Sequence, residues 1–194
     1  MKNKNVPTLD GFIKLEVFDA DGKRIKIRRF KMRSYVMNMT ELLYLGFIGA
    51  TGAYAVKDTS DVNRSPNNPV KQFRLAAAAG NATLGIQVGT DATAVAITQT
   101  KLIVPIAEGV GAGQLNYQLL AVTVPATIGS RRYTLATRSF VNNSGNTIIV
   151  REIGMIVDQD DWKFLIARDI CTAEQGTILN TQTLAVTYDI GVTV

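Results

Sequence analysis

The sequence contains no histidine and only one cysteine, Cys171. Histidine is the commonest general base and the commonest metal ligand in proteins, so its absence removes the usual centre of acid–base catalysis and of zinc binding. A single cysteine excludes an intrachain disulfide and a cysteine-based zinc cluster. Because a free cysteine without a histidine partner usually acts as a small apolar side chain, we expect Cys171 to fill space in the core.

Charged residues are also scarce, at 19% of the chain, and tryptophan occurs only once. A surface with little charge and many small polar groups is typical of a subunit that buries part of itself against neighbours, although it also fits an ordinary β-rich protein. The hydrophobic fraction of 46% is sufficient for a sizeable core. The 194 residues are therefore expected to form one large domain, or one domain with an N-terminal appendage.

Long apolar runs are absent as well. The first residues are polar and contain no apolar segment of the kind that a signal peptide requires. The best candidate for a membrane span, 41–55, is shorter than the roughly 20 residues needed and contains several glycines. We therefore expect synthesis in a cytoplasm and no membrane partner.

The chain does contain a series of β-strand patterns separated by turn residues. Three runs, 131–141, 147–157 and 162–169, are rich in β-branched and aromatic residues. Asn-Ser-Gly and aspartate-rich turns lie between them, so the pattern predicts a three-stranded antiparallel meander. The last run, 183–194, alternates apolar and polar residues throughout, which predicts a strand that is tied into a sheet.

The N-terminal part predicts a basic β-hairpin. A strand at 11–18 is followed by an Asp-Ala-Asp-Gly turn and a return strand at 23–33. The basic residues of the return strand are Lys23, Arg24, Lys26, Arg28, Arg29, Lys31 and Arg33. One face of this strand is basic, which fits contact with nucleic acid or with an acidic neighbouring subunit. A charged strand facing water is the structural alternative, and no series of stacking aromatics favours nucleic acid.

One helix is predicted, at 34–48, from apolar residues at helical spacing. It is apolar on more than one face, so we expect it to lie in the core or against a partner. The segment 57–69 has no periodicity and contains two prolines, which predicts an exposed polar loop that is suited to contact between subunits. The candidate interface residues in these segments are Arg24, Lys26, Arg28, Arg29, Tyr35, Leu42, Tyr44, Phe47 and Arg64.

No group of residues in the sequence indicates catalysis, a cofactor or a metal ion. The acidic cluster at 158–161 lies in a turn, and the glycine-rich run 109–113 lacks the Lys-Ser/Thr of a phosphate loop. Glu152 lies mid-strand among apolar residues and needs a partner if it is buried. Arg138 on the preceding strand is the predicted partner, in a structural ion pair.

The C-terminal half contains six short motifs built mainly from turn and packing residues. They are Val88-Gly89-Thr90-Asp91, Gly113-Gln114-Leu115-Asn116-Tyr117, Phe140-Val141-Asn142-Asn143-Ser144-Gly145, Glu152-Ile153-Gly154, Ala167-Arg168-Asp169 and Leu184-Ala185-Val186-Thr187-Tyr188. Together they resemble motifs of small β-rich structural proteins of tailed bacteriophages, over 85–194 and more loosely elsewhere. The resemblance implies a non-enzymatic component of the virion, in the tail, neck, fibre base or capsid decoration.

These observations predict a mainly β protein, an antiparallel, jelly-roll-like β-sandwich with one helix near 34–48 and an N-terminal β-hairpin. We expect an N-terminal arm and hairpin at 1–33 and a sandwich domain at 34–194. The expected function is self-assembly into a ring, tube or shell of a virion, with a second copy and other virion proteins as partners. The alternative is a carbohydrate- or receptor-binding module of a tail fibre, which would present exposed aromatics on one face.

Overall fold

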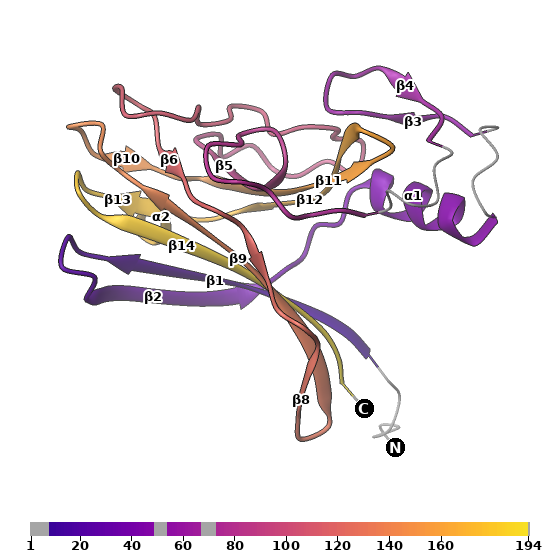
Figure 1. Cartoon of the computed structure of the whole chain (residues 1–194), viewed down its shortest axis with the longest axis horizontal. Coiled ribbons are helices and arrows are strands. Elements are labelled where there is room, and N and C mark those ends of the chain that lie inside the picture. Colours follow the sequence, from indigo (N-terminus) through magenta and orange to yellow (C-terminus); the bar gives the residue numbers. More distant parts are fainter. Residues whose placement is uncertain (1–7, 49–53, 67–72, 194) are drawn as a thin grey trace.

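Two antiparallel sheets, of seven and three strands, make up most of the protein in the computed structural model, which describes residues 8–48, 54–66 and 73–193. They pack face to face, and two small two-stranded sheets and two helices lie around them (Figure 1). In the large sheet the strand order is β2 (Arg24–Lys31), β1 (Thr8–Phe18), β14 (Thr183–Thr193), β9 (Arg131–Val141), β6 (Asn116–Tyr117). Two further short strands, β7 (Ala121–Val122) and β8 (Ala126–Ile128), also pair with β9. The second sheet has the order β12 (Trp162–Ile170), β11 (Glu152–Gln159), β5 (Gly85–Gly89). The other elements are α1 (Met37–Ile48), α2 (Ala173–Gly176) and the pairs β3 (Val56–Lys57) with β4 (Asn63–Arg64) and β10 (Ile148–Ile149) with β13 (Thr177–Ile178).

The C-terminal strand β14 is the centre of the large sheet. It pairs along its whole length with β1 on one side and with β9 on the other. Its alternate residues Leu184, Val186 and Tyr188 point into the core and are 0% exposed. Each such side chain contributes roughly 1.5–3 kcal/mol by leaving water. The prediction that the last run forms a strand within a sheet is thus confirmed.

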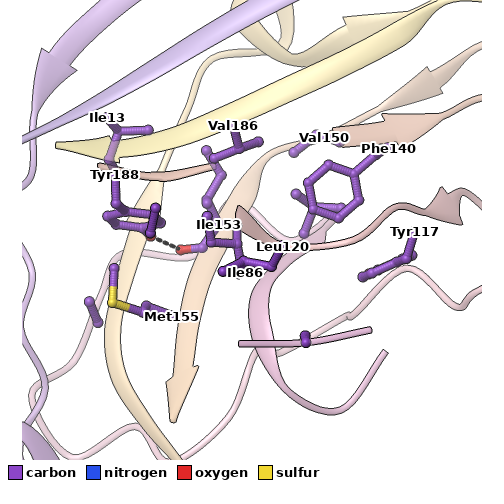
Figure 2. Packing of buried hydrophobic residues seen from close by; sticks show 14 of the residues in the cluster. Ile13, Ile86, Tyr117, Leu120, Phe140, Val150, Ile153, Met155, Val186 and Tyr188 are labelled. Atoms are coloured by element: carbon purple, nitrogen blue, oxygen red, sulfur yellow. Dashed lines mark hydrogen bonds between the residues drawn. The ribbon is translucent and has the colours of Figure 1, made fainter. Parts of the chain in front are cut away.

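The main core lies between the two sheets (Figure 2). Ile13 and Tyr188 from the large sheet meet Ile86, Ile153 and Met155 from the second sheet. The Tyr188 hydroxyl lies 3.4 Å from the carbonyl oxygen of Ile153 and donates a hydrogen bond to it, so the buried phenol is not left without a partner.

Every residue of β11 is buried, which requires cover on both faces of the second sheet. One face meets the large sheet. The other carries a smaller cluster in which Ile156 and Leu165 contact Val36 and Leu102, from the segments before α1 and after β5. This double cover explains why the run from Ile153 to Val157 is apolar without alternation.

The predicted meander is wrong in one strand. β11 and β12 form the expected hairpin, but β9 pairs with β14 and lies in the other sheet. The turn after β9 directs the chain from one sheet to the other. Its Asn142 side chain donates to the carbonyl oxygens of Asn146 at 2.8 Å and Ile178 at 3.0 Å, which closes the turn and holds it against β13.

The helix begins at Met37, three residues later than predicted. Before it, Tyr35 forms an antiparallel bridge to Ala167, and the Val36 amide donates to the Ile166 carbonyl oxygen at 3.1 Å. Residues 34–36 are thus extended along β12 and cannot be helical. A short second helix, α2, was not predicted; Thr172 and Gln175 form a capping box at its start.

The segment predicted as a polar loop at 57–69 contains a small hairpin instead, β3 with β4, and its residues 67–69 lie outside the described part of the chain. Asp58 organises the turn. Its carboxylate accepts hydrogen bonds from the amides of Ser60 at 2.8 Å and Val62 at 3.0 Å, and from Arg64 Nε at 2.7 Å. Hydrogen bonds between the Asp58 side chain and its own turn therefore hold this segment, although the segment has no apolar periodicity.

The N-terminal hairpin is present as predicted, with Gly22 at φ 76° in its turn. Its first strand, β1, pairs with β2 and with β14, so the hairpin is part of the large sheet, and residues 1–7 lie outside the described ranges. The predicted fold class, an antiparallel β-sandwich with this hairpin and a helix near 34–48, is confirmed. No helix in the described ranges is long and apolar enough to cross a membrane.

Cys171 is 2% exposed, as expected for a core residue, and burial raises the pKa of its thiol to about 12. Because only the thiolate is a good nucleophile, we expect an aromatic disulfide reagent at pH 8 to modify the native protein at least roughly 1,000-fold more slowly than the urea-unfolded chain. Stopped-flow absorbance measures both rates. Comparable rates would show that the Cys171 region opens readily.

Candidate functional site

The structure separates the two residues that were predicted to form an ion pair. Arg138 points into the core from β9, is 0% exposed and has no carboxylate partner among the described residues. Each of its five N–H groups donates to a backbone carbonyl oxygen instead. The acceptors are Gln118 at 2.8 Å, Leu84 at 3.0 Å, Ile86 at 3.1 Å, Ala78 at 3.1 Å and Asn81 at 2.6 Å. The guanidinium therefore joins the segments 78–86 and 118 to the large sheet.

Glu152 pairs with Arg168 rather than with Arg138. Arg168 Nε lies 2.7 Å from a Glu152 carboxylate oxygen, and both side chains are 0% exposed. The backbone amides of Ile103 and Val104 also donate to Glu152, at 3.1 and 2.8 Å. In the β11–β12 register Arg168 stands opposite Gly154, so it is the diagonal neighbour of Glu152 on the same face. The pair is structural, since it joins both strands to the segment that follows β5.

Most basic residues of strand β2 have partners within the chain itself. Arg24 pairs with Glu16 at 2.8 Å, Arg28 pairs with Glu174 at 2.9 Å, and Lys26 donates to the Glu174 carbonyl oxygen at 2.8 Å. Phosphate contacts need cations that are free to displace counterions. These internal partners therefore weaken the case for nucleic acid as the partner of this strand.

Arg29 belongs to a cluster on the outer face of the large sheet. It pairs with Asp189 at 3.1 Å and lies over the Phe12 ring, 3.9 Å from the centroid. Arg131 lies 2.7 Å from carboxylate oxygens of both Asp10 and Asp189, and its hydrogen bond lowers the pKa of Asp10. The cluster borders an open hollow of about 500 Å³. It joins β1, β2, β9 and β14 and thereby stiffens this end of the sheet.

The helix residues predicted for an interface differ widely in exposure. Leu42 is 0% exposed and packs in the core, so its prediction as a contact residue is wrong; at helical spacing it shares the inner face with Leu45. Tyr35 is half-buried against the core. Tyr44 and Phe47 are 47% and 84% exposed.

Two further aromatic contacts lie beside the helix. Tyr44 and Tyr54 meet edge to face, with ring centroids 5.4 Å apart. Arg64 pairs with Asp58 at 2.7 Å and lies 5.4 Å from the centroid of half-buried Trp162, so it is a fixed part of the β3–β4 hairpin.

A projecting arm is the surface feature that the sequence analysis missed. It consists of 119–135 together with the adjoining ends of β1 and β14, and Figure 1 shows it extending away from the sandwich. Every residue from 121 to 130 is exposed. The large apolar side chains of the arm and their exposed fractions are Leu9 65%, Leu119 65%, Val122 52%, Val124 84%, Ile128 68% and Val192 43%. The sequence does contain an indication of this apolar surface, because 109–130 contains no charged residue.

Much of this apolar surface continues the face that forms the core at the other end of the sheet. Val192 lies opposite both Leu9 and Arg132, and Val122 lies opposite Ala136, so these side chains share the face of Tyr188. β1, β9 and β14 have 11 residues each, whereas β5, β11 and β12 have 5, 8 and 9. The second sheet is therefore too short to cover the arm.

A metal-binding cluster is not found among the described residues, since no group of three or more cysteines, aspartates and glutamates among them could hold a metal ion. Asp169 has a raised pKa, caused by its burial, but its carboxylate accepts the Arg33 amide at 3.0 Å and holds the chain before α1. Comparison of the chain with protein-family models, with curated proteins and with solved structures finds no match.

Proposed function

We propose that this protein is a non-enzymatic structural protein of the virion of a tailed bacteriophage, and that it self-assembles into a ring, tube or shell. The observation that carries the proposal is the arm, whose apolar side chains project into solvent from the large sheet. Soluble monomers rarely expose contiguous apolar surface of this kind unless it binds something. The motif resemblance in 85–194 supplies the virion context.

The arm alone accounts for only part of the free energy of assembly. Burying the exposed parts of four aliphatic side chains, Leu9, Val122, Val124 and Val192, which are 43–84% exposed, contributes roughly 4–7 kcal/mol. The loss of translational and rotational freedom opposes association by about 4–15 kcal/mol. A stable assembly therefore needs a complementary surface that adds further contacts, and the exposed face of α1 is suited to that role.

A tail-fibre module that binds sugar is the alternative function, and the aromatic residues argue against it. Trp162 is half-buried and stacked beneath Arg64. Tyr44 and Tyr54 contact each other edge to face at an interplanar angle of 70°, so their rings do not form one flat platform. Apolar side chains that project from a helix fit contact between proteins better than sugar stacking.

Substitution of the arm tests the proposal. Replacing both Val122 and Val124 with serine is expected to raise the concentration at half-assembly at least roughly 30-fold, because each exposed valine loses about 1–2 kcal/mol of burial in the contact. Sedimentation velocity measures the assembly, and negative-stain images show its form. The fold is expected to persist, since both side chains are exposed in the single chain.

The matched control replaces Val62 and Val110, which are 43% and 62% exposed outside the arm, with serine. This variant is expected to assemble like the wild type. Monodisperse wild-type monomer at high concentration would overturn self-assembly. Unchanged assembly of the arm variant would exclude the arm as the contact.

A further inference from the structure

Two exposed apolar patches on this chain include charged residues of opposite sign, Arg132 in the first and Glu41 in the second. The first is the arm patch, on the sheet face of the arm: Leu9, Val122, Val192 and Arg132. The second is the helix patch, on and beside α1: Met37, Glu41, Tyr44, Phe47 and Tyr54. Met37 and Tyr54 are 43% and 39% exposed, and Phe47 is 84% exposed, so the helix patch is open to solvent.

Among the described residues, the charged side chains of the two patches form no ion pair. Glu41 is the only charged residue of α1, and it accepts a hydrogen bond of 3.3 Å from the Tyr54 hydroxyl. Arg132 is exposed and donates to the Thr127 hydroxyl at 3.0 Å. Neither forms an ion pair among the described residues. The adjacent Arg131, by contrast, is held by two carboxylates.

We propose that the arm patch of one copy packs on the helix patch of a second copy, with Arg132 paired to Glu41. This contact rests on the proposed self-assembly. A helix laid on an open sheet face is a standard way to bury apolar surface. The opposite charges then meet at the edge of an apolar contact, where they fix its register and exclude wrong partners.

The charges favour this pairing over contacts between like patches. Two arm patches face to face would place Arg132 near a second Arg132, and two helix patches would do the same with Glu41. Like charges at an interface oppose binding, whereas the arm–helix contact satisfies both. In the single chain α1 packs on β12 and β3. Two copies can each place the arm patch on the helix patch of the other, which gives a closed dimer. Alternatively, each copy can contact a different copy at each of its two patches, which gives a ring or tube.

Charge reversal tests the contact. Arg132→Glu and Glu41→Arg are each expected to raise the concentration at half-assembly at least roughly tenfold. Mixing equal amounts of the R132E and E41R chains is expected to restore assembly to within about threefold of the wild type, because every contact between the two variants again joins opposite charges. Sedimentation velocity of each chain and of the mixture measures this. Lys23→Glu is the matched control, since it makes the same charge change at an exposed turn residue.

The possible outcomes distinguish failure of the proposed arm–helix contact from failure of the proposed function. If both single variants assemble like the wild type while the Val122/Val124 serine variant does not, the Arg132–Glu41 contact is wrong and self-assembly through the arm stands. If the singles dissociate but their mixture does not recover, the pairing is also wrong. If the wild type remains a monomer at all concentrations, the proposed function fails and the contact fails with it.

Discussion

Replacing Glu152 with alanine is expected to lower the free energy of unfolding by about 3–5 kcal/mol, because it leaves the buried Arg168 without its nearest carboxylate. The loss is large since both side chains are 0% exposed and water cannot take the place of the acid. Asp91, 3.1 Å from Arg168 but partly exposed, compensates only in part. The amides of Ile103 and Val104 also lose their acceptor. Urea denaturation followed by circular dichroism measures the change.

Two further variants separate charge from shape. Glu152→Gln keeps the size of the side chain and an amide oxygen for the two amides, so we expect a smaller loss, of about 2–3 kcal/mol. Replacing Glu152 and Arg168 together with methionine removes both charges, and it should recover much of the stability that the alanine variant loses. If the alanine variant lost less than about 1 kcal/mol, the pair would have to be solvated in solution.

The identity of this pair shows what strand periodicity can and cannot predict. Alternation places Glu152 on an apolar face and therefore predicts a buried acid that needs a cation. It does not say which strand lies beside it. Arg138 and Arg168 both follow strand patterns that point inward, and only the register of β11 with β12 selects Arg168. Pairing between strands distant in sequence depends on the whole sheet, which explains why the strand at 131–141 was assigned to the wrong neighbour.

The arm was missed for a related reason. Leu9 and Val192 continue the apolar alternation of their strands, and that pattern predicts burial. They are exposed because the second sheet has shorter strands, a property of other segments of the chain. Conversely, the hairpin turn ending in Gly22 could be predicted locally, since the left-handed φ of 76° favours glycine. The turn residues, and the face of the strand on which each side chain lies, can be predicted from the sequence. Whether the second sheet covers that face cannot.

The second large effect concerns Arg138. Replacing it with lysine is expected to lower the free energy of unfolding by about 4 kcal/mol or more, because an ammonium has three donors where the guanidinium has five. At least two of the five carbonyl oxygens then lose the donor that Arg138 supplies, at about 1–3 kcal/mol each. The cation also loses its position 4.8 Å from the centroid of the Tyr117 ring. Urea denaturation with hydrogen exchange of the 78–86 amides measures the effect.

Arg151→Lys is the matched control, since this half-buried arginine donates to a single carbonyl oxygen, that of Cys171, at 3.3 Å. We expect it to cost less than about 1 kcal/mol. Arg138 holds the carbonyl of Gln118, immediately before the arm begins at Leu119. The lysine variant should therefore loosen the root of the arm before the sandwich unfolds, and it should weaken assembly at temperatures where the fold persists. A variant as stable as the wild type would mean that the five carbonyl oxygens find other donors, and the arm would then owe its rigidity to the Arg131 cluster instead.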